Sequence, residues 1–402
     1  MLPLFYLISH YSNLPFRAWE QRKLGEVFTE RSEKSSKGEL ISVTISSGVI
    51  KASELERKDI SSSDKSNYKV VKKGDIAYNS MRMWQGASGH SLFDGILSPA
   101  YTIITPKKNI SSKFISYIFK KHNMIQNFQR RSQGLTSDTW NLKFPALSGI
   151  KVKIPNYTEQ AKISDFFQHI DNTIALHQRK LDALKKMKKG FLQQMFPKSE
   201  EDVPKIRFTD FNGNWRQRKL EEVADRVRGN DRRMELPTLT ISASKGWLNQ
   251  HDRFFGNIAG KEQKNYTLLK KGQLSYNHGN SKSAKYGAVF VLRTYDEALV
   301  PRIYHSFKTN ILANSDFIEY LFATKIPDRE LRKIVSSGAR MDGLLNINFN
   351  DFMSILIMLP FVEEQIKISN SLIRLDKIIS LYQNKLDQLI KLKKAYLQYL
   401  FI

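Results

Sequence analysis

The sequence has no cysteine among its 402 residues. A disulfide framework and a zinc site with thiolate ligands are therefore excluded. A chain without cysteine suits a reducing compartment, and we expect it to work in the cytoplasm. Long apolar runs are also missing. Residues 2–8 are apolar, but the run is too short to span a bilayer and lacks the flanks of a signal peptide, so we expect no membrane association.

The recognisable motifs of catalysis are missing as well. There is no Pro-Pro pair, which a methyltransferase acting on an amino group carries in its active site. Residues 256–261 loosely resemble a phosphate loop, but the spacing is one residue short and Glu262 stands where a magnesium-binding Ser or Thr belongs. Pro327-Asp328 is the only Pro-Asp pair and no Asp/Glu-x-Lys follows it, so a nuclease site with clustered carboxylates is not predicted.

The eight histidines lack the spacing of metal ligands. One of them, His177, falls on the apolar stripe of a predicted helix, where a packed side chain is the expected role. We therefore predict that this chain is not an enzyme by itself, with no catalytic residue, no metal and no cofactor of its own.

Acidic residues are few relative to basic ones. The sequence has 39 Asp and Glu against 64 Lys and Arg, a formal charge of +25. Residues 159–196 and 363–402, which we predict below to be long helices, each hold seven basic and four acidic residues, so +19 remains on the rest of the chain. An excess of this size favours a polyanionic partner, most often nucleic acid. A basic protein with no such partner is the alternative on charge alone.

The strongest feature that is present is an internal repeat. Pro155 and Pro360 lie 205 positions apart, and the same offset carries residues 155–196 onto 360–401 without a gap. The matched pairs include Glu159 with Glu364, Asp171 with Asp376, Lys180 with Lys385, Leu181 with Leu386, Asp182 with Asp387 and Phe196 with Phe401. The protein is therefore predicted to consist of two similar halves.

Each copy of this repeat has the pattern of a long amphipathic helix. Apolar residues recur at steps of three and four, close to a heptad seam, and a proline precedes each run. A helix over residues 159–196 would be about 57 Å long at about 1.5 Å per residue, and one apolar stripe of that length calls for a partner helix. The other copy is the obvious partner. The alternative is two unrelated helices, each packed on its own domain.

The segments before each helix repeat more loosely. Residues 19–27 correspond to 215–223, residues 72–79 to 270–277, and residues 114–119 to 317–322, with an offset that grows from 196 to 203. Between these blocks the two halves differ in length and content. Diverged loops on a duplicated framework favour two domains that do the same job on different targets.

These patterns predict an α+β fold: two tandem, pseudo-symmetric α/β domains joined by two long helices that pair with each other. Strands are expected at residues 40–45, 69–71, 76–79, 101–104, 150–154 and 354–359, and short helices at 112–122 and 315–324, each opened by a serine cap. The expected boundaries are an atypical lead-in at 1–16, a first domain at 17–155, a central helix at 156–198, a second domain at 199–360 and a last helix at 361–402.

This layout closely resembles the specificity subunit of type I restriction-modification systems. The resemblance is carried by Trp19 and Trp215 with the residues that follow them, by the blocks 72–79 and 270–277, and by the Pro-x-x-x-Glu-Gln-x-Lys-Ile start of each helix. It covers nearly the whole chain from Trp19 onward. The sequence departs from the family pattern at its opening, where the usual lead-in before Trp19 is absent.

The resemblance implies that each globular domain is a target-recognition domain reading one half of a bipartite, asymmetric site in double-stranded DNA. It implies that the two helices form an antiparallel coiled coil. This helix pair sets the spacer between the half-sites and docks two modification subunits, which methylate adenine with S-adenosylmethionine. Restriction subunits that translocate DNA with ATP and Mg²⁺ complete such complexes. Two DNA-binding domains that contact successive major grooves would lie one helical turn apart, roughly 34–36 Å. Helices of about 57 Å are long enough to connect them.

Candidate DNA contacts follow from the chemistry of base recognition, which favours Arg, Lys, Asn and Gln. Residues 79–86 of the first domain follow a predicted strand and combine a guanidinium, amides and an aromatic ring; residues 277–285 hold the equivalent place in the second. Secondary candidates are residues 130–133, answered loosely by Ser336, Ser337 and Arg340, and the basic run 226–233. The predicted DNA-binding residues are Asn79, Arg82, Trp84, Gln85, Arg130, Arg131, Gln133, Asn277, Asn280, Lys282, Lys285 and Arg340.

Other interpretations remain open from the sequence. Any one of these loop residues can be an ordinary solvated side chain. Trp19 and Trp215 are expected in the framework core, and residues 185–189 on a solvated helix face or a partner contact. A scaffold whose duplicated helices clamp protein partners, with domains that bind nucleic acid without sequence preference, is the rival function.

Overall fold

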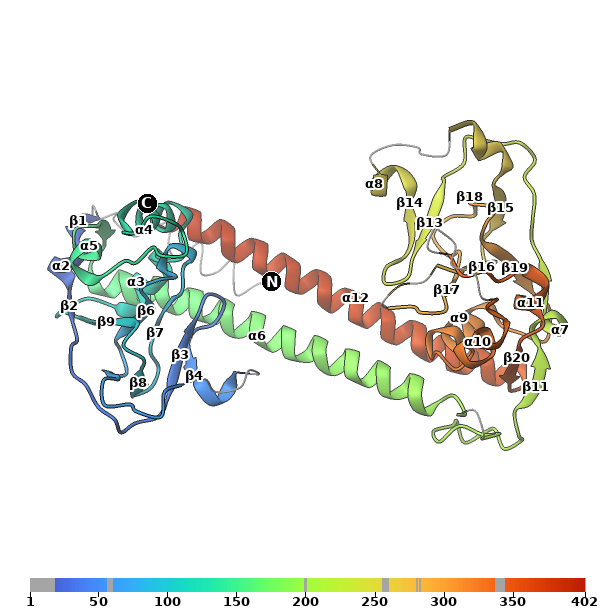
Figure 1. Cartoon of the computed structure of the whole chain (residues 1–402), viewed down its shortest axis with the longest axis horizontal. Coiled ribbons are helices and arrows are strands. Elements are labelled where there is room, and N and C mark those ends of the chain that lie inside the picture. The colour runs from blue at the N-terminus through green and yellow to red at the C-terminus, as the bar shows by residue number, and fades with distance from the viewer. Residues whose placement is uncertain are drawn as a thin grey trace. The chain divides into compact units, whose positions relative to one another are not determined.

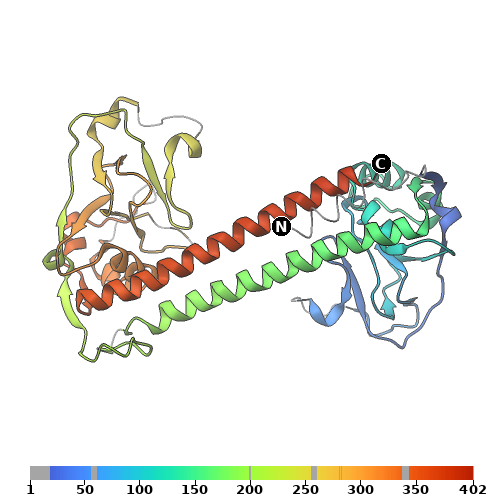
Figure 2. The same ribbon diagram turned by 180° about the vertical axis from the view of Figure 1, so that it is seen from behind.

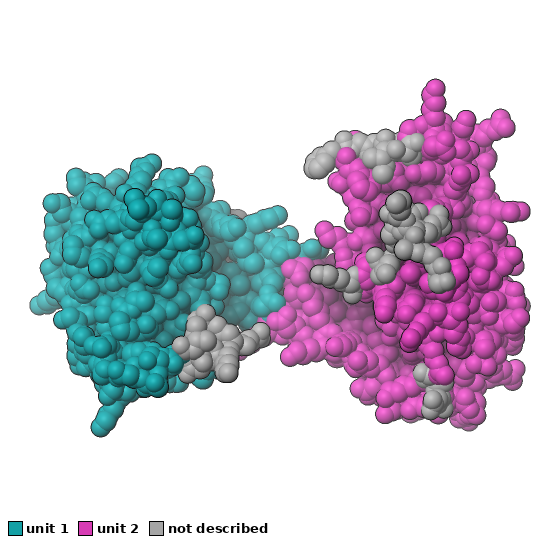
Figure 3. Space-filling view, viewed as in Figure 1, with its two compact units in different colours: residues 1–178, 384–402 teal, residues 179–383 magenta. Residues whose placement is uncertain are grey.

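The computed structural model describes residues 19–55, 61–198, 201–254, 260–279, 281, 283–336 and 344–401. It divides into two compact units (Figure 3): unit 1 is residues 1–178 with 384–402, and unit 2 is residues 179–383. Each unit holds one globular domain and one end of each long helix. We call the globular parts domain 1 (residues 19–154) and domain 2 (residues 201–359). The expected lead-in at residues 1–16 lies outside the described residues.

Domain 1 is built from short strands and helices (Figure 1). In chain order these are β1 (Glu20–Lys23), α2 (Leu24–Val27), β2 (Phe28–Glu30), β3 (Ile41–Thr44), β4 (Gly48–Lys51), η1 (Ala52–Glu54), β5 (Lys69–Val71), β6 (Ile76–Asn79), η2 (Met83–Gln85), β7 (Ser88–His90), β8 (Gly95–Leu97), β9 (Tyr101–Pro106), α3 (Ser112–Ile118), α4 (His122–Arg131), α5 (Phe144–Ser148) and β10 (Lys151–Ile154).

Domain 2 repeats this order almost element for element. Its elements are β11 (Arg216–Lys219), α7 (Leu220–Val223), β12 (Ala224–Arg226), β13 (Leu239–Ser242), β14 (Gly246–Asn249), α8 (Gln250–Phe254), η3 (Gly260–Asn265), β15 (Thr267–Lys270), β16 (Leu274–Asn277), β17 (Ala288–Val291), β18 (Glu297–Val300), β19 (His305–Thr309), α9 (Ser315–Ala323), α10 (Asp328–Ile334), α11 (Phe349–Met353) and β20 (Leu356–Leu359).

The sheets of the two domains have the same topology. Domain 1 contains a four-stranded antiparallel sheet in the order β2-β9-β6-β7, and domain 2 contains β12-β19-β16-β17. In both, the first strand pairs with the last: Glu20 lies opposite Ile154, and Arg216 lies opposite Leu359. The central strands β6 and β16 also share one burial pattern, with three buried residues followed by a half-buried asparagine. The repeat in the sequence is thus a repeat of the fold.

The repeated block Lys-Lys-Gly before β6 and β16 has the same structural role in both domains. The glycines occupy the left-handed region, with φ of +97° at Gly74 and +84° at Gly272, which L side chains rarely adopt. In each turn the residue after the glycine accepts a backbone hydrogen bond at 2.9 Å, through Asp75 Oδ2 from Lys72 N–H and through Gln273 Oε1 from Lys270 N–H. The block therefore encodes a tight turn into the central strand.

The two long helices are α6 (Tyr157–Gln194) and α12 (Val362–Tyr399), each of 38 residues. Within each unit they lie side by side in both ribbon views (Figures 1 and 2). In unit 1 the rings of Phe166 and Tyr396 are 5.1 Å apart, so the start of α6 meets the end of α12. In unit 2 the Lys188 ammonium lies 2.6 Å from Asp376, so the end of α6 meets the start of α12. This pairing is antiparallel, as predicted.

A buried glutamine at the start of each long helix forms hydrogen bonds with the backbone of the adjoining domain. Gln160 Oε1 accepts the backbone N–H of Ser111 at 2.9 Å, and its Nε2 donates to Pro155 O at 2.9 Å. Gln365 repeats both bonds, accepting Asn314 N–H at 2.8 Å and donating to Pro360 O at 2.9 Å. The Gln of the repeated motif thus satisfies backbone groups next to the first turn of α3 and of α9.

The glutamate beside it behaves differently in the two halves. Glu159 accepts Nε1–H of Trp19 at 3.0 Å. Glu364 is fully buried and accepts hydrogen bonds from Nε and Nη2 of Arg207, at 2.8 and 2.7 Å. Trp215 Nε1 consequently has no hydrogen-bond partner among the described residues. The lead-in to domain 2 supplies the arginine, and the sequence around residue 11 has none at the corresponding place.

Each domain core is completed by the far end of a long helix. Phe196, which follows α6, is 1% exposed and packs on Trp215 and Phe317 of domain 2, with ring centroids 6.1 and 5.2 Å away. Phe401, which follows α12, packs on Phe114 and Phe167 of unit 1 at 5.2 and 5.5 Å. Trp215 is buried as expected, whereas Trp19 is half-buried against the core of unit 1.

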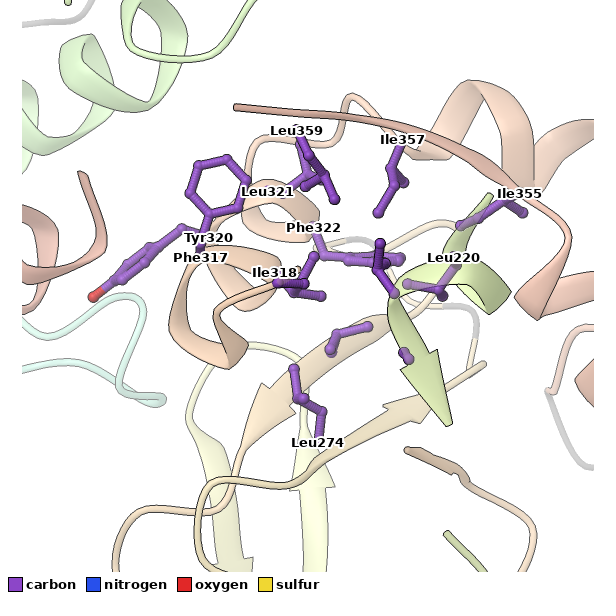
Figure 4. Packing of buried hydrophobic residues seen from close by; sticks show 14 of the residues in the cluster. Leu220, Leu274, Phe317, Ile318, Tyr320, Leu321, Phe322, Ile355, Ile357 and Leu359 are labelled. Atoms are coloured by element: carbon purple, nitrogen blue, oxygen red, sulfur yellow. The ribbon is translucent and has the colours of Figure 1, made fainter. Parts of the chain in front are cut away.

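Figure 4 shows part of the domain 2 core, in which the side chains of α9 interdigitate with those of α7, β16 and β20. Two details of the predicted helices are wrong. The helix expected at 112–122 ends at Ile118, because the chain turns through residues 119–121 before α4 begins. The caps are Ser111 and Asn314, whose side chains accept the N–H of Phe114 and Phe317, so the second cap is not a serine.

Candidate nucleic-acid interface

The first candidate loop follows β6 and is shaped by its own side chains. Asn79 Oδ1 accepts the N–H of Met81 at 3.0 Å, which turns the chain at the end of the strand. Met83 is fully buried, and Gly86, with φ of +84°, ends the short helix η2. Arg82, between these anchors, is exposed and makes no ion pair with any residue in the described ranges. The loop therefore presents a free guanidinium on a fixed backbone.

A second segment, residues 132–142, joins this loop. Leu142 N–H donates to Ser80 O at 2.8 Å, and Gln133 and Asn141 exchange two backbone hydrogen bonds at 3.0 and 2.8 Å. The indole of Trp140 meets that of Trp84 edge-on, with ring centroids 5.3 Å apart. The structure thus brings the predicted residues Trp84 and Gln133 onto neighbouring segments. Trp140 was not predicted, although an aromatic in an otherwise polar, exposed stretch was a visible signal.

The remaining candidates of domain 1 lie close by along the chain. Arg130 and Arg131 form the last turn of α4, immediately before this segment, and both are exposed. Gln85 is half-buried in η2. The oxygen of Asn79 is already used in the turn, which gives that residue a structural role in addition to its predicted DNA contact.

Lys120, which was not among the predicted residues, stabilises the loop after β6 through hydrogen bonds. Lys120 Nζ donates to Gly86 O at 2.6 Å and to Ile45 O at 3.2 Å, so it ties the loop after β6 to the β3–β4 turn. Burial, and to a smaller degree the charge of Lys393, lowers the pKa of Lys120 to about 8. No local pattern marks Lys120, because its partners are backbone carbonyls far away in the sequence.

Domain 2 places an equivalent loop after β16. Asn277 Oδ1 accepts the N–H of Gly279 at 3.1 Å, and Leu345 N–H donates to His278 O at 2.8 Å, which repeats the bond from Leu142 to Ser80. Lys285 is exposed, and its Nζ lies 5.8 Å from the Tyr286 ring. The predicted contacts Asn280, Lys282 and Arg340, together with Ser337, lie outside the described residues.

Where domain 1 has Ser80, domain 2 has a histidine pair formed by buried His278 and half-buried His305. His278 stacks on His305 with ring centroids 4.9 Å apart and an interplanar angle of 9°. His305 Nε2 lies 2.9 Å from Ile347 O. Burial lowers the pKa of His305 to about 4, with smaller effects from His278 and Arg226. The residues that pack beneath the loop after β16 thus differ in chemistry from those at the equivalent position in domain 1.

The basic run 226–233 is only partly available to a ligand. Arg233 is held by Asp231 and Glu297, each at 2.7 Å. Arg226 lies 4.2 Å from the Phe349 ring centroid. Arg228 and Arg232 make no ion pair with any residue that the structure describes. The candidates in this run are therefore reduced to these two arginines.

Among the described residues, no group of three or more His, Cys, Asp or Glu side chains is arranged to hold a metal ion. No helix within the described ranges combines the length and the apolar character needed to cross a bilayer. The phosphate-loop-like segment at 256–261 lies largely outside the described residues.

Comparison with known proteins agrees with this architecture. Residues 17–186 match the family model of the type I restriction modification DNA specificity domain. The chain is similar to type I restriction-modification specificity subunits over most of its length. It is 23% identical over 351 residues to the type I restriction enzyme MjaVIII specificity subunit of Methanocaldococcus jannaschii, covering 82% of this chain and 79% of that protein.

A second relative is the putative MjaX specificity subunit of the same organism, which is 24% identical over 201 residues, covering 45% of this chain and 46% of the relative. Among solved structures, the fold is similar to that of a type I restriction-modification S subunit from M. genitalium. The TM-score is 0.58 at 13% identity, with 97% of this chain and 98% of the other covered. The chain thus shares its fold with that S subunit.

Proposed function

We propose that this chain is the subunit that selects the DNA sequence at which a type I restriction-modification complex acts. In this proposal domain 1 and domain 2 each read one half of a bipartite site. The observation that carries it is the contrast between framework and loops. The same strand, turn and asparagine lead into Arg82 and Trp84 in one domain and into a different loop with Lys285 in the other.

The chemistry of the loops supports reading of DNA. A free guanidinium reads guanine through O6 and N7 in the major groove, and amides read adenine. Domain 1 presents Arg82 and Gln133 for this purpose, with Arg130 and Arg131 suited to phosphates. Charge supports the same conclusion, because +19 of the formal charge lies outside the two long helices.

The proposal extends to partners. The chain itself performs no chemistry; it directs two modification subunits that methylate adenine, and restriction subunits that translocate DNA join the complete complex. S-adenosylmethionine, ATP and Mg²⁺ bind those partners and not this chain. The helix pair sets the spacer between the half-sites and docks the modification subunits.

The experiment is modification mapping. The chain would be produced with its modification subunit in a methylation-free host, and N6-methyladenine would be located by single-molecule sequencing. We expect one split motif with a fixed spacer that disappears when this chain is omitted. Replacing residues 17–155 with the first domain of another family member should change one half of the motif only.

The rival is a scaffold that binds nucleic acid without sequence preference. It predicts equal affinity for all duplexes at a given salt concentration, with a steep loss of affinity as salt rises. Methylation spread over unrelated sequences, or a stable complex with no motif, would favour the scaffold and refute our proposal.

A further inference from the structure

A three-residue contact joins domain 1 to both long helices. The hydroxyl of Tyr117, on α3, donates to Asp171 Oδ2 on α6 at 2.9 Å. Lys393, on α12, places Nζ 2.5 Å from the other oxygen of the same carboxylate. The Lys393 ammonium also lies 5.7 Å from the centre of the Tyr117 ring. One carboxylate therefore connects three elements, one from the domain and one from each helix.

Unit 2 contains the same contact, built from the other half of each repeat. Tyr320, on α9, donates to Asp376 Oδ2 on α12 at 2.7 Å, and Lys188, on α6, lies 2.6 Å from Asp376 Oδ1. Its ammonium is 5.5 Å from the Tyr320 ring. The 205-residue offset relates Asp171 to Asp376 and Lys188 to Lys393. Two separate occurrences with one geometry indicate a selected arrangement and not a chance surface pair. We call these contacts the two joints.

The joints are more than solvated ion pairs. Tyr117 is 8% exposed and Tyr320 is 4% exposed, and the four charged side chains are 27–39% exposed. Burial, followed by the neighbouring aspartate, raises the pKa of Tyr117, so its hydroxyl stays protonated and can donate. Burial and the hydrogen bond to Asp376 do the same for Tyr320. A carboxylate that accepts a phenol and an ammonium at once has its direction fixed at both oxygens.

In each joint the lysine comes from the helix that follows the other domain. Lys393 belongs to α12, which begins at domain 2, and Lys188 belongs to α6, which begins at domain 1. A domain that met only its own helix could rotate about that single contact. The joint adds a polar contact to the second helix, beside the packing of Phe401 in unit 1 and of Phe196 in unit 2, and so restricts this rotation.

We propose that the two joints are positioning devices that fix the rotation of each recognition domain on the helix pair and thereby enforce the spacer of the split DNA site. This inference rests on the proposed function. Adding one base pair to the spacer turns one half-site by about 34–36° relative to the other, since B-DNA has 10–10.5 base pairs per turn. A domain that is held to both helices cannot follow that turn without breaking a joint.

The test measures spacer selectivity in the assembled methyltransferase complex. Duplexes would carry both half-sites separated by the native spacer or by one or two base pairs more or fewer. Variants are Tyr117→Phe, which removes one hydroxyl, Lys393→Met and Asp171→Ala, with Tyr320→Phe and Asp376→Ala for the second joint. Lys394→Met is the matched control, because Lys394 is an exposed neighbour with no ion pair to any described residue.

We expect each joint variant to methylate altered spacers about tenfold better relative to the native spacer, as removal of a hydrogen bond to a charged group warrants. Preference for the bases within each half-site should not change, and the exchanged pair Asp171→Lys with Lys393→Asp should restore part of the selectivity. Lys394→Met should match the wild type.

Other outcomes would overturn the inference. Unchanged spacer selectivity, or an equal loss of activity on every duplex, would show that the joints only stabilise the fold; Tyr117→Phe, the mildest variant, guards against simple unfolding. If the wild-type complex itself had no split motif, the proposed function would fail and the inference with it. A split motif in the wild type with rigid spacers in every variant would refute the inference alone.

Discussion

The hydrogen-bond and ion-pair partners of an arginine distinguish a candidate for base recognition from a residue that stabilises the fold. Arg31 donates to both oxygens of buried Asp75, at 2.8 and 3.1 Å, and so belongs to the fold. Arg82 is exposed and has no such partner among the described residues. A guanidinium already paired to a buried carboxylate cannot turn to a base without leaving that charge unsatisfied. Arg82 carries no such cost.

The first prediction concerns Arg82 itself. Arg82→Ala should relax discrimination at one position of one half-site, at a cost of about 1–3 kcal/mol. Methylation rates on duplexes with single substitutions at each position of both half-sites would measure this. Lys108→Ala, which removes an exposed cation from the same domain, serves as the control. A loss of equal size on every duplex would place Arg82 at a phosphate and not at a base.

The second prediction concerns the histidine pair. Because the pKa of His305 lies at about 4 in the folded chain and at about 6.5 in an unfolded one, the unfolded state binds the proton first. The free energy of unfolding of domain 2 should therefore fall as the pH drops from 6.5 towards 4, by about 2 kcal/mol at pH 5.

Hydrogen exchange of the β16 and β19 amides at pH 7 and pH 5, corrected for intrinsic rates, would measure this change. His305→Phe should remove most of the difference between the two pH values. An equal pH dependence in the wild type and the variant would assign the effect to other groups.

Among elements, the junction of domain and helix is the most closely repeated part of the structure. Gln160 and Gln365 each make bonds to the same three kinds of backbone group: an N–H at a helix cap, the proline carbonyl before the long helix, and a loop carbonyl at Asn109 or Leu312. Loss of either glutamine side chain should lower the free energy of unfolding, because several buried backbone groups would be left without a hydrogen-bond partner. Hydrogen bonding thereby explains why the two copies of the motif have the same spacing.

The third prediction follows from this junction. Gln160→Ala and Gln365→Ala should each lower the free energy of unfolding of their own domain by about 1–3 kcal/mol. Gln168→Ala should have little effect, because Gln168 is half-buried and its amide donates to the side chain of Asn172, on the same helix, at 3.0 Å. Thermal unfolding followed by hydrogen exchange in each domain would separate the two sites. If both variants were as stable as the control, the two glutamines would not stabilise the junction between domain and helix.

The elements were largely predictable because their signals are local. Periodicity and the gapless repeat were enough to predict both long helices, and the strands at 69–71 and 76–79 were predicted residue by residue. The caps and the end of α3 were not, since either of two adjacent residues could cap and tertiary packing decided between them. Lys120 and Trp140 were missed for a related reason: their partners lie in segments remote in sequence, which one sequence does not pair.

At the scale of the whole molecule, each half depends on residues from the other half. Unit 1 ends with residues 384–402, more than two hundred positions after its domain, and unit 2 begins within α6 at residue 179. Phe401 and Lys393 complete the structure around domain 1, as Phe196 and Lys188 complete it around domain 2. Neither half of the sequence therefore contains a complete folding unit.

The fourth prediction tests this dependence. Phe401→Ala, at the extreme end of the chain, should destabilise domain 1 by about 3–5 kcal/mol, because it empties the space between Trp19, Phe114 and Phe167. Domain 2 should keep its stability. Phe196→Ala should have the opposite effect, since its ring packs on Trp215 and Phe317 of unit 2.

Hydrogen exchange resolved by peptide would read both domains in one experiment. Tyr399→Ala, an exposed ring two residues from Phe401, is the matched control. Equal weakening of both domains by Phe401→Ala would mean that the chain unfolds as one cooperative body. Weakening of domain 2 alone would contradict the packing. Loss confined to domain 1 would show that the last residues of the sequence stabilise the first domain, so that truncation at the C-terminus disables the half-site read by the N-terminal half.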